Sequence, residues 1–417
     1  MATKFGDNPY YYKYWCGHGD LVYLSDSQCQ KKFPSRFDRD YRCRSYHTII
    51  PFDLGYSADN PNASDIVVNV TALDGFNIPY LDQINLMLIM IRRDPADDQV
   101  YYRYISNGRH DIPVETWSSS KIFAIADGGG ILALNCTGSV AGFQPVEGLD
   151  AYTMGSQGET LLGDLCTIIT TYDSTHNYTS NSLGKYFATV GGHARLNTLV
   201  QGSWLGRGTN ESLGGYYGEP IPADLGFTFY QQPHPSSHSC TVDPNLNQAP
   251  ISDTLSAFSQ AEMVRRLVLN REVLKANRFP GMTWESTTNV LYGATQTVFF
   301  PGTQWGGMSA SVDIFVQAGL NITEIELQSN GDWRIFSKFG DGDGDVDPST
   351  GYTNGEIVSN NYACFPNFDQ TSSRPSVEFV LSARASFPGS QPLQATEDSL
   401  ESCLGAIVQL ILQGKIE

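Results

Sequence analysis

The order of the apolar segments along the chain limits the possible folds more than any other feature. Strand-like runs occur near both ends of the chain, at residues 65–73, 84–93, 99–106, 332–340, 355–365 and 376–386. Between the two groups, apolar residues recur at the three- and four-residue spacing of helices, at 122–134, 159–172, 183–201 and 253–274. A further periodic segment, opened by polar residues from Thr396, predicts a C-terminal helix with a capped start.

This order predicts an α+β fold, in which one antiparallel β-sheet is built from both chain ends and covered by helices as an α/β/α sandwich. A helical subdomain at about 122–330 is inserted between the strands. Residues 1–60 contain three cysteines and a cluster of tyrosines, so we expect an extension that packs on a main domain at 61–417. Within the helical part, residues 202–251 form a long irregular loop, and loops of this length are usually functional.

The charge balance excludes two kinds of partner. Acidic residues outnumber basic ones 44 to 26, for a formal net charge of −18. A chain of this charge, without a lysine- and arginine-rich stripe, is not expected to bind nucleic acid or an anionic membrane surface. No apolar run reaches the length of about 20 residues that a membrane span needs. The expected partner is a small-molecule or peptide substrate, and the sequence does not determine the oligomeric state.

Cysteines and glycosylation motifs favour an exported protein. The N-terminus is polar and aromatic rather than a signal peptide, as in a mature chain. Eight scattered cysteines form no C-x-x-C pair and suggest some disulfides: Cys16, Cys29, Cys43, Cys136, Cys166, Cys240, Cys364 and Cys403. Six N-x-S/T motifs begin at Asn62, Asn69, Asn135, Asn177, Asn210 and Asn321. We therefore predict an extracellular or periplasmic location.

The first candidate for chemistry is an S-x-x-K motif at Ser118 and Lys121. It opens an apolar helix, so the two side chains are expected one turn apart on the same face. A lysine partly removed from water can act as a base on a serine hydroxyl, and a helix N-terminus favours developing negative charge. The alternative is a serine-rich helix cap followed by a surface lysine. The motif alone is weak, because a second copy occurs at Ser182 and Lys185.

Two further motifs follow in a defined order. Thr179-Ser180-Asn181 lies in a polar loop between two helices, and Lys338-Phe339-Gly340 closes a late strand before a glycine- and aspartate-rich loop. The order S-x-x-K, S/T-x-N, K-x-G resembles the penicillin-recognising serine hydrolases, which include the β-lactamases and the D-alanyl-D-alanine peptidases. The resemblance extends from near Asn69 to the final helix, and it implies a β-lactamase/transpeptidase-like fold.

The resemblance also implies roles for individual residues. Ser118 would be the acylated nucleophile and Lys121 its proton acceptor. Thr179 would relay a proton to the leaving group, Asn181 would bind the substrate amide, and the charge of Lys338 would steer protons and anionic substrate groups. The neighbouring motif residues Ser180, Phe339 and Gly340 are candidates for substrate binding. An oxyanion hole would use the backbone N–H of Ser118 and one on the strand after the third motif.

The long loop contains a further element of this resemblance. Residues 242–247, V-D-P-N-L-N, resemble the E-P-x-L-N segment of class A β-lactamases, whose carboxylate positions the hydrolytic water. Asp243 would replace the glutamate with a shorter side chain, and Asn247 would match the asparagine. A proline turn capped by an aspartate is the alternative.

Departures from the family pattern bear on the substrate. Phe339 stands where β-lactam-binding members carry a small residue, which weakens the usual grip on a β-lactam carboxylate. We therefore expect an esterase, amidase or peptidase acting through an acyl-Ser118 intermediate without a cofactor. The alternatives are a non-catalytic binding or structural protein on the same scaffold, and a true β-lactamase or penicillin-binding peptidase. The chain lacks the G-x-S-x-G, H-E-x-x-H and phosphate-loop motifs of other hydrolases and nucleotide-binding proteins.

A dense acidic segment follows the third motif. Its carboxylates could hold a structural calcium ion through oxygen ligands, and they belong to Asp341, Asp343, Asp345, Asp347 and Glu356. A solvated acidic turn is the alternative, because Thr350 stands where a calcium-binding EF-hand loop requires glycine.

Overall fold

The structure is a computed structural model, and it describes residues 43, 50–60, 62–136, 152–155, 158–171, 178–230, 239–244, 251–292, 334–346, 351, 353–365, 376–386 and 393–417. The chain divides into two compact units. The helical unit comprises Met1–Asp7, Ser120–Thr254 and Arg266–Ala310. The sheet unit comprises Asn8–Ser119, Leu255–Arg265 and Ser311–Glu417.

The sheet unit contains a seven-stranded sheet in the described part of the chain, in the order β1–β4–β3–β13–β12–β11, with β2 beside β4. All pairs are antiparallel except β2 with β4. The strands are β1 Ser57–Ala58, β2 Val68–Asn69, β3 Ile84–Arg93, β4 Val100–Ser106, β11 Arg334–Val346, β12 Thr353–Phe365 and β13 Val377–Ser386. The β3–β13 pair joins the early strands to the late ones, so the predicted antiparallel sheet built from both chain ends is confirmed.

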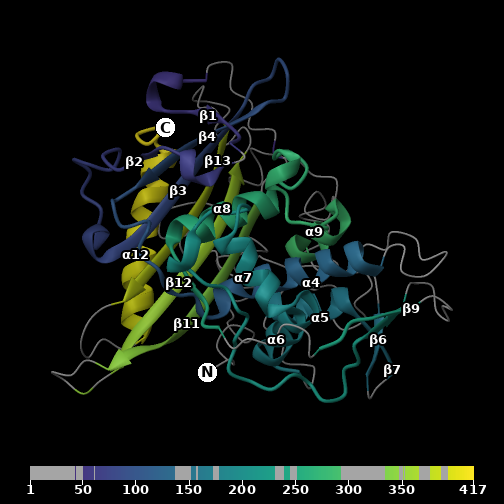
Figure 1. Cartoon of the computed structure of the whole chain (residues 1–417). Helices are drawn as coiled ribbons and strands as arrows, with labels where there is room; N and C mark the ends of the chain where they lie inside the picture. Colours follow the sequence, from purple (N-terminus) through teal and green to yellow (C-terminus); the bar gives the residue numbers. More distant parts are fainter. Residues whose placement is uncertain are drawn as a thin grey trace, which may run out of the picture. The chain divides into compact units, whose positions relative to one another are not determined.

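Helices cover this sheet. All ten residues of β3 are buried, as its largely apolar sequence predicts for a strand covered on both faces. Helix α12, Leu393–Leu412, packs along β11, β12 and β13 (Figure 1). The first part of α8, Ala257–Val268, reaches the strands through polar contacts, because Gln260 Oε1 accepts a 2.9 Å hydrogen bond from Asn360 Nδ2 on β12. The predicted capped start at Thr396 is wrong, since α12 begins three residues earlier.

Two predicted strands have different lengths in the structure. Of residues 65–73, only Val68 and Asn69 pair, and turns follow them. The strand expected to end at Gly340 continues to Val346, because β12 is equally long and pairs with it beyond Asp341 and Asp343. The segment interpreted as a glycine- and aspartate-rich loop is therefore largely strand.

The helical unit packs α4 against α6 and α9, and α5 against the same two helices. The helices are α4 Lys121–Cys136, α5 Leu162–Thr171, α6 Ser180–Gly191, α7 His193–Gln201 and α9 Trp284–Tyr292. The helix expected at 183–201 is broken at Gly192, whose φ of 93° is incompatible with a continuous right-handed helix. The segment 159–172 begins as a strand and becomes helical only at Leu162.

Short elements complete the two units. A small antiparallel sheet, which the sequence did not predict, contains β6 Tyr152–Gly155, β7 Gly158–Leu161, β8 Thr228–Tyr230 and β9 Ser239–Thr241. Strands β5 Val114–Glu115 and β10 Thr254–Leu255 also pair. The 3₁₀ helices are η2 Phe52–Leu54, η3 Ala63–Asp65, η4 Leu81–Gln83, η5 Trp117–Ser120, η7 Gly208–Asn210 and η8 Lys275–Asn277.

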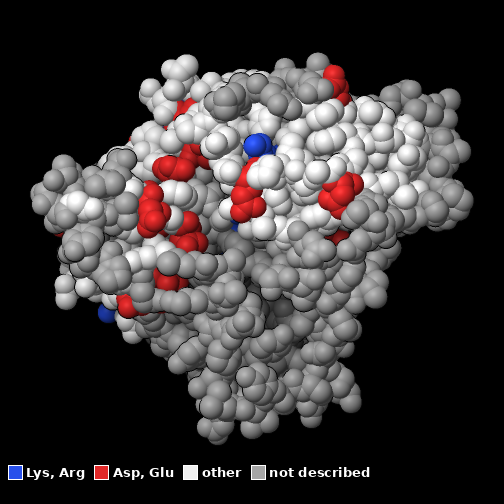
Figure 2. Space-filling view, turned by 90° about the horizontal axis from the view of Figure 1, so that it is seen from below, with Lys and Arg blue, Asp and Glu red and all other residues white. Residues whose placement is uncertain are grey.

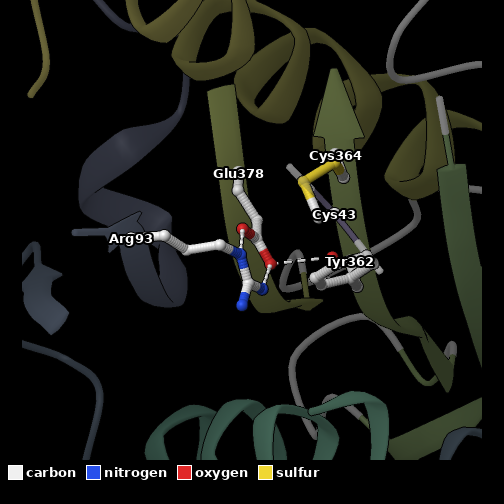
Figure 3. Close-up of a disulfide and its surroundings, with 5 residues drawn as sticks. All are labelled: Cys43, Arg93, Tyr362, Cys364 and Glu378. Atoms are coloured by element: carbon white, nitrogen blue, oxygen red, sulfur yellow. Dashed lines mark hydrogen bonds and ion pairs between the residues drawn. A yellow bond between two sulfur atoms is a disulfide. The ribbon is translucent and has the colours of Figure 1, made fainter. Parts of the chain in front are cut away.

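Part of the N-terminal extension is covalently attached to the sheet. Cys43 forms a disulfide with Cys364 of β12, with a Cα–Cα distance of 6.1 Å (Figure 3). Cys240 is also disulfide-bonded, whereas Cys166 and Cys403 are free thiols in the interior. The prediction that cysteines form disulfides is therefore confirmed for Cys43 and Cys364. Most of residues 1–49 lie outside the described residues.

Acidic side chains predominate among the described charged residues on one face of the molecule (Figure 2). Figure 2 shows acidic side chains spread over one face, with few basic ones among them. The glycosylation-motif residues Asn62 and Asn210 are exposed, whereas Asn177 and Asn321 lie outside the described residues. Across the described helices, none is long and apolar enough to cross a membrane.

Candidate active site

The S-x-x-K motif lies at the start of an uninterrupted helical segment. Ser118 belongs to the 3₁₀ turn η5, and α4 begins at Lys121 without a break, so the motif residues lie one helical turn apart. Lys121 is fully buried and Ser118 is half-buried. The alternative of a surface lysine is therefore wrong.

In the helical unit, the Nζ atom of Lys121 contacts the second motif at the start of α6. Lys121 Nζ donates hydrogen bonds to Ser180 Oγ at 3.0 Å and to Asn181 Oδ1 at 2.5 Å. Thr179 instead caps α6, because its hydroxyl oxygen accepts a 3.1 Å hydrogen bond from Ser182 N. The hydroxyl that contacts the buried lysine is thus that of Ser180, not that of Thr179.

Tyr217 of the long loop forms one wall around Lys121. The lysine Nζ lies 5.6 Å from the centroid of the buried tyrosine ring, and the tyrosine hydroxyl lies 3.2 Å from Ser120 Oγ. Burial, followed by the charge of nearby Asp253, raises the pKa of Tyr217 well above its usual value, so the phenol stays protonated at neutral pH. Gly184 allows this packing, since a Cβ there would lie 2.9 Å from Tyr217 Cδ2 and 3.1 Å from Lys121 Cγ.

Glu219, two residues further along the loop, contacts the second motif. Its carboxylate accepts a hydrogen bond from Thr179 Oγ1 and another, of 3.3 Å, from Asn181 Nδ2. Tyr217 and Glu219 could not be identified as site residues from the sequence, because no motif surrounds them. The only available signal was the length of the loop that contains them.

In the sheet unit, the backbone around Ser118 lies against the third motif. A Cβ on Gly340 would lie 2.6 Å from Thr116 O and 2.7 Å from Ser118 N. A Cβ on Gly342 would lie 2.3 Å from the Trp117 ring. Glycines two residues apart on β11 share one face, which lets the segment around Ser118 approach this strand closely. This alternation was the sequence signal for a strand beyond Gly340.

Lys338 precedes these glycines on the same face of β11, since it lies two residues before Gly340. Its side chain is fully buried, and its Nζ donates a 3.1 Å hydrogen bond to Phe339 O. Phe339 is itself buried, with 5% of its surface exposed. The sheet unit thus contains a buried cation and a close-packed glycine on the strand face that contacts the Ser118 backbone.

We expect Gly340→Ala to disturb this contact strongly. The added Cβ must displace the backbone of Thr116 and Ser118 by several tenths of an ångström, because the atoms it meets belong to main chain. The expected cost is about 1–3 kcal/mol of stability, with covalent labelling of Ser118 slowed about 10²-fold. Chemical denaturation and the rate of fluorophosphonate labelling measure the two effects. Labelling at the wild-type rate would contradict the importance of this close approach.

The residues proposed from the long loop are only partly described. Asp243 is exposed just after β9, and Asn247 lies outside the described residues. The carboxylate that contacts the second motif is that of Glu219.

The acidic residues after the third motif do not form a cluster in the described part of the chain. Asp341 and Asp343 are exposed on β11, whereas the Glu356 carboxylate accepts hydrogen bonds from Trp117 Nε1 at 3.2 Å and from Arg384. The side chain of Asp345 and all of Asp347 lie outside the described residues. Among the residues that are described, no group of three or more potential metal ligands occurs.

Comparison with known proteins identifies similar solved structures only. No protein-family model matches the chain, and no curated protein does. A class A β-lactamase from Bacteroides cellulosilyticus is 11% identical, covers 81% of this chain and 94% of its own, and has a TM-score of 0.37. The TP domain of penicillin-binding protein 3 from Burkholderia pseudomallei is 13% identical, covers 82% and 91%, and has a TM-score of 0.36. A class D β-lactamase from Fusobacterium nucleatum is 11% identical, covers 81% and 95%, and has a TM-score of 0.34. These proteins belong to the superfamily that the three sequence motifs resemble.

Proposed function

We propose that the protein is a serine hydrolase that cleaves an ester or amide bond through an acyl-Ser118 intermediate. The observation that carries this proposal is the environment of Lys121, a fully buried lysine one helical turn from Ser118 whose Nζ is held by Ser180 and Asn181. Burying an ammonium group is costly unless it is paired and hydrogen-bonded, and a lysine removed from water gives up its proton more readily than an exposed one.

In the first chemical step, Lys121 in its neutral form accepts the hydroxyl proton of Ser118. The serine oxygen then attacks the substrate carbonyl carbon, and the carbonyl oxygen becomes an oxyanion. When the tetrahedral intermediate collapses, the bond to the alcohol or amine breaks and the departing group takes up a proton. Ser180 is suited to relay that proton from Lys121, because its hydroxyl contacts Lys121 Nζ at 3.0 Å.

In the second step, water attacks the acyl carbon, the bond from that carbon to Ser118 Oγ breaks, and one proton of the water passes to Ser118 Oγ as the free acid leaves. Roles for Thr179 and Asp243 in these steps stay predictions from the family resemblance. So do roles for Lys338 and for an oxyanion hole at the Ser118 N–H.

The compartment proposed for this reaction is extracellular or periplasmic. The Cys43–Cys364 disulfide supports it, because disulfides persist mainly in oxidising environments. The proposed substrate is a small ester, amide or peptide rather than a β-lactam, because Phe339 occupies the position where β-lactam-binding members carry a small residue.

The test is intact-mass spectrometry after exposure to a fluorophosphonate, benzylpenicillin and a small activated ester, each with wild type and with Ser118→Ala. We expect a mass increase with the fluorophosphonate or the ester in wild type, located on Ser118 by peptide mapping and absent from the variant. The second S-x-x-K copy gives a matched control, since Ser182 Oγ donates to Thr179 O at 3.0 Å and Ser182→Ala should label normally.

The reagents separate the remaining candidates. A lasting adduct with benzylpenicillin alone would favour a penicillin-binding peptidase or receptor, and rapid turnover of it would favour a β-lactamase. If no reagent labels the folded wild-type protein, the hydrolase proposal is wrong and a non-catalytic binding protein becomes the better account.

A further inference from the structure

The long loop holds its position through a buried aspartate. Asp253 Oδ1 accepts hydrogen bonds from Gly214 N at 2.8 Å and Gly215 N at 2.7 Å. Gly215, at a φ of 70°, packs so closely that a Cβ would lie 2.2 Å from Ala188 Cβ on α6. The residues that follow, Tyr217 and Glu219, therefore start from a fixed point beside α6.

Glu219 restricts the orientation of the Asn181 amide. An ionised carboxylate only accepts hydrogen bonds, so it requires the NH₂ group of Asn181, and Asn181 Nδ2 donates to it at 3.3 Å. The amide oxygen then faces Lys121, and Asn181 Oδ1 accepts from Lys121 Nζ at 2.5 Å. A lysine amine can donate this hydrogen bond both in its charged form and in the neutral form that accepts the Ser118 proton. Turning the amide over would direct its oxygen at the Glu219 carboxylate, a repulsive contact, and would take the acceptor away from Lys121. The Glu219 carboxylate therefore selects one orientation of the amide.

Glu219 also contacts the residue that caps α6. Thr179 caps the helix through Ser182 N, and its hydroxyl proton is donated to the Glu219 carboxylate. The same carboxylate thus connects the cap of α6 and the Asn181 side chain, while Tyr217 limits the movement of Lys121 from another side.

We propose that Glu219 is a positioning residue for Lys121, which it orients through the Asn181 amide. This inference rests on the proposed hydrolase function, in which Lys121 is the proton acceptor. A base that is misplaced by about 1 Å can lose about 10²-fold in rate. Neutralising Glu219 is therefore expected to slow the covalent step without weakening the initial encounter with a small reagent.

The test compares Glu219→Gln with wild type in saturation kinetics of fluorophosphonate labelling, which separate the maximal labelling rate from the half-saturating concentration. We expect the maximal rate to fall about 10- to 100-fold, while the half-saturating concentration and the melting temperature stay at wild-type values. Asp224→Asn is the matched control, because Asp224 lies on the same loop but accepts its hydrogen bond from Tyr178 OH instead.

A second comparison tests the route of the effect. If Glu219 acts through Asn181, the double variant Glu219→Gln/Asn181→Ala should label no more slowly than Asn181→Ala alone. Independent, additive losses would contradict that route. If Glu219→Gln fails to fold, Glu219→Asp, which keeps the charge but shortens the side chain, should show an intermediate rate.

The outcomes separate this inference from the function on which it rests. Wild type that labels on Ser118, together with Glu219→Gln that labels at the same maximal rate, would overturn the positioning role and leave the hydrolase proposal intact. Wild type that does not label at all would overturn both.

Discussion

Replacing Lys121 by methionine is expected to slow acylation of Ser118 about 10²–10⁴-fold at neutral pH, the usual contribution of a positioned general base. Methionine has a similar length and suits the fully buried site. The substitution removes the only group that the proposed mechanism uses to take the serine proton. Stopped-flow or quenched labelling with an activated ester measures the rate.

Lys185→Met is the matched control for this prediction. Lys185 belongs to the chance copy of the motif, lies on α6, and is partly exposed above the Tyr216 ring at 5.6 Å. In the Lys185→Met variant, Ser118 should be labelled at close to the wild-type rate. If Lys121→Met labels equally fast while remaining folded, Lys121 is not the base and its burial must have a structural cause.

Glu378→Ala is expected to destabilise the protein by about 3–5 kcal/mol, because it removes the carboxylate that forms an ion pair with a buried cation. Glu378 on β13 accepts two hydrogen bonds from Arg93 on β3, from Nε at 3.1 Å and from Nη2 at 2.7 Å (Figure 3). Tyr362 OH on β12 donates to the same carboxylate at 2.8 Å. Burial lowers the pKa of Arg93, but the adjacent Glu378 carboxylate outweighs burial and raises this pKa above its usual value. Arginine is not deprotonated in proteins, so the guanidinium keeps its charge when Glu378 is replaced, although the carboxylate that favoured the charged form is gone.

The neighbouring pair supplies the control. Arg92 contacts Glu417 at 3.3 Å, and the Glu417 side chain is 49% exposed, so Glu417→Gln should cost only about 0–1 kcal/mol. Urea unfolding monitored by fluorescence measures both changes. Replacing both partners in Arg93→Met/Glu378→Leu should recover much of the loss, since no unpaired charge remains. A single Glu378→Ala variant as stable as Glu417→Gln would contradict the importance of the buried pair.

The strands that the sequence predicted well are those whose side chains are buried on both faces. The apolar run at 84–93 became β3, and the late runs became β11, β12 and β13. Short strands without a clear hydrophobic pattern were not predicted, because they pair with strands far away in the sequence. Examples are β6 and β8, three or four residues each, which pair across about seventy residues of intervening sequence.

The candidate site residues also differ in how far the sequence could predict them. The sequence pointed to Ser118 and Lys121 as a pair because they are three residues apart, and a helix brings residues at that spacing close together. Local sequence could not show which hydroxyl of the second motif contacts Lys121. Thr179 caps the helix through Ser182 and donates to Glu219, so the hydroxyl that contacts Lys121 is that of Ser180.

By itself, therefore, the sequence determined the antiparallel sheet from both chain ends, the position of the S-x-x-K motif and the acidic character of the protein. These features depend on hydrophobic periodicity, helical spacing and composition, all of which can be read along the chain. Only the tertiary structure decided that Tyr217 and Glu219 surround Lys121 and Asn181, and that Gly340 contacts the Ser118 backbone. Those contacts join segments tens to hundreds of residues apart, and they arise because each unit packs such segments together in three dimensions.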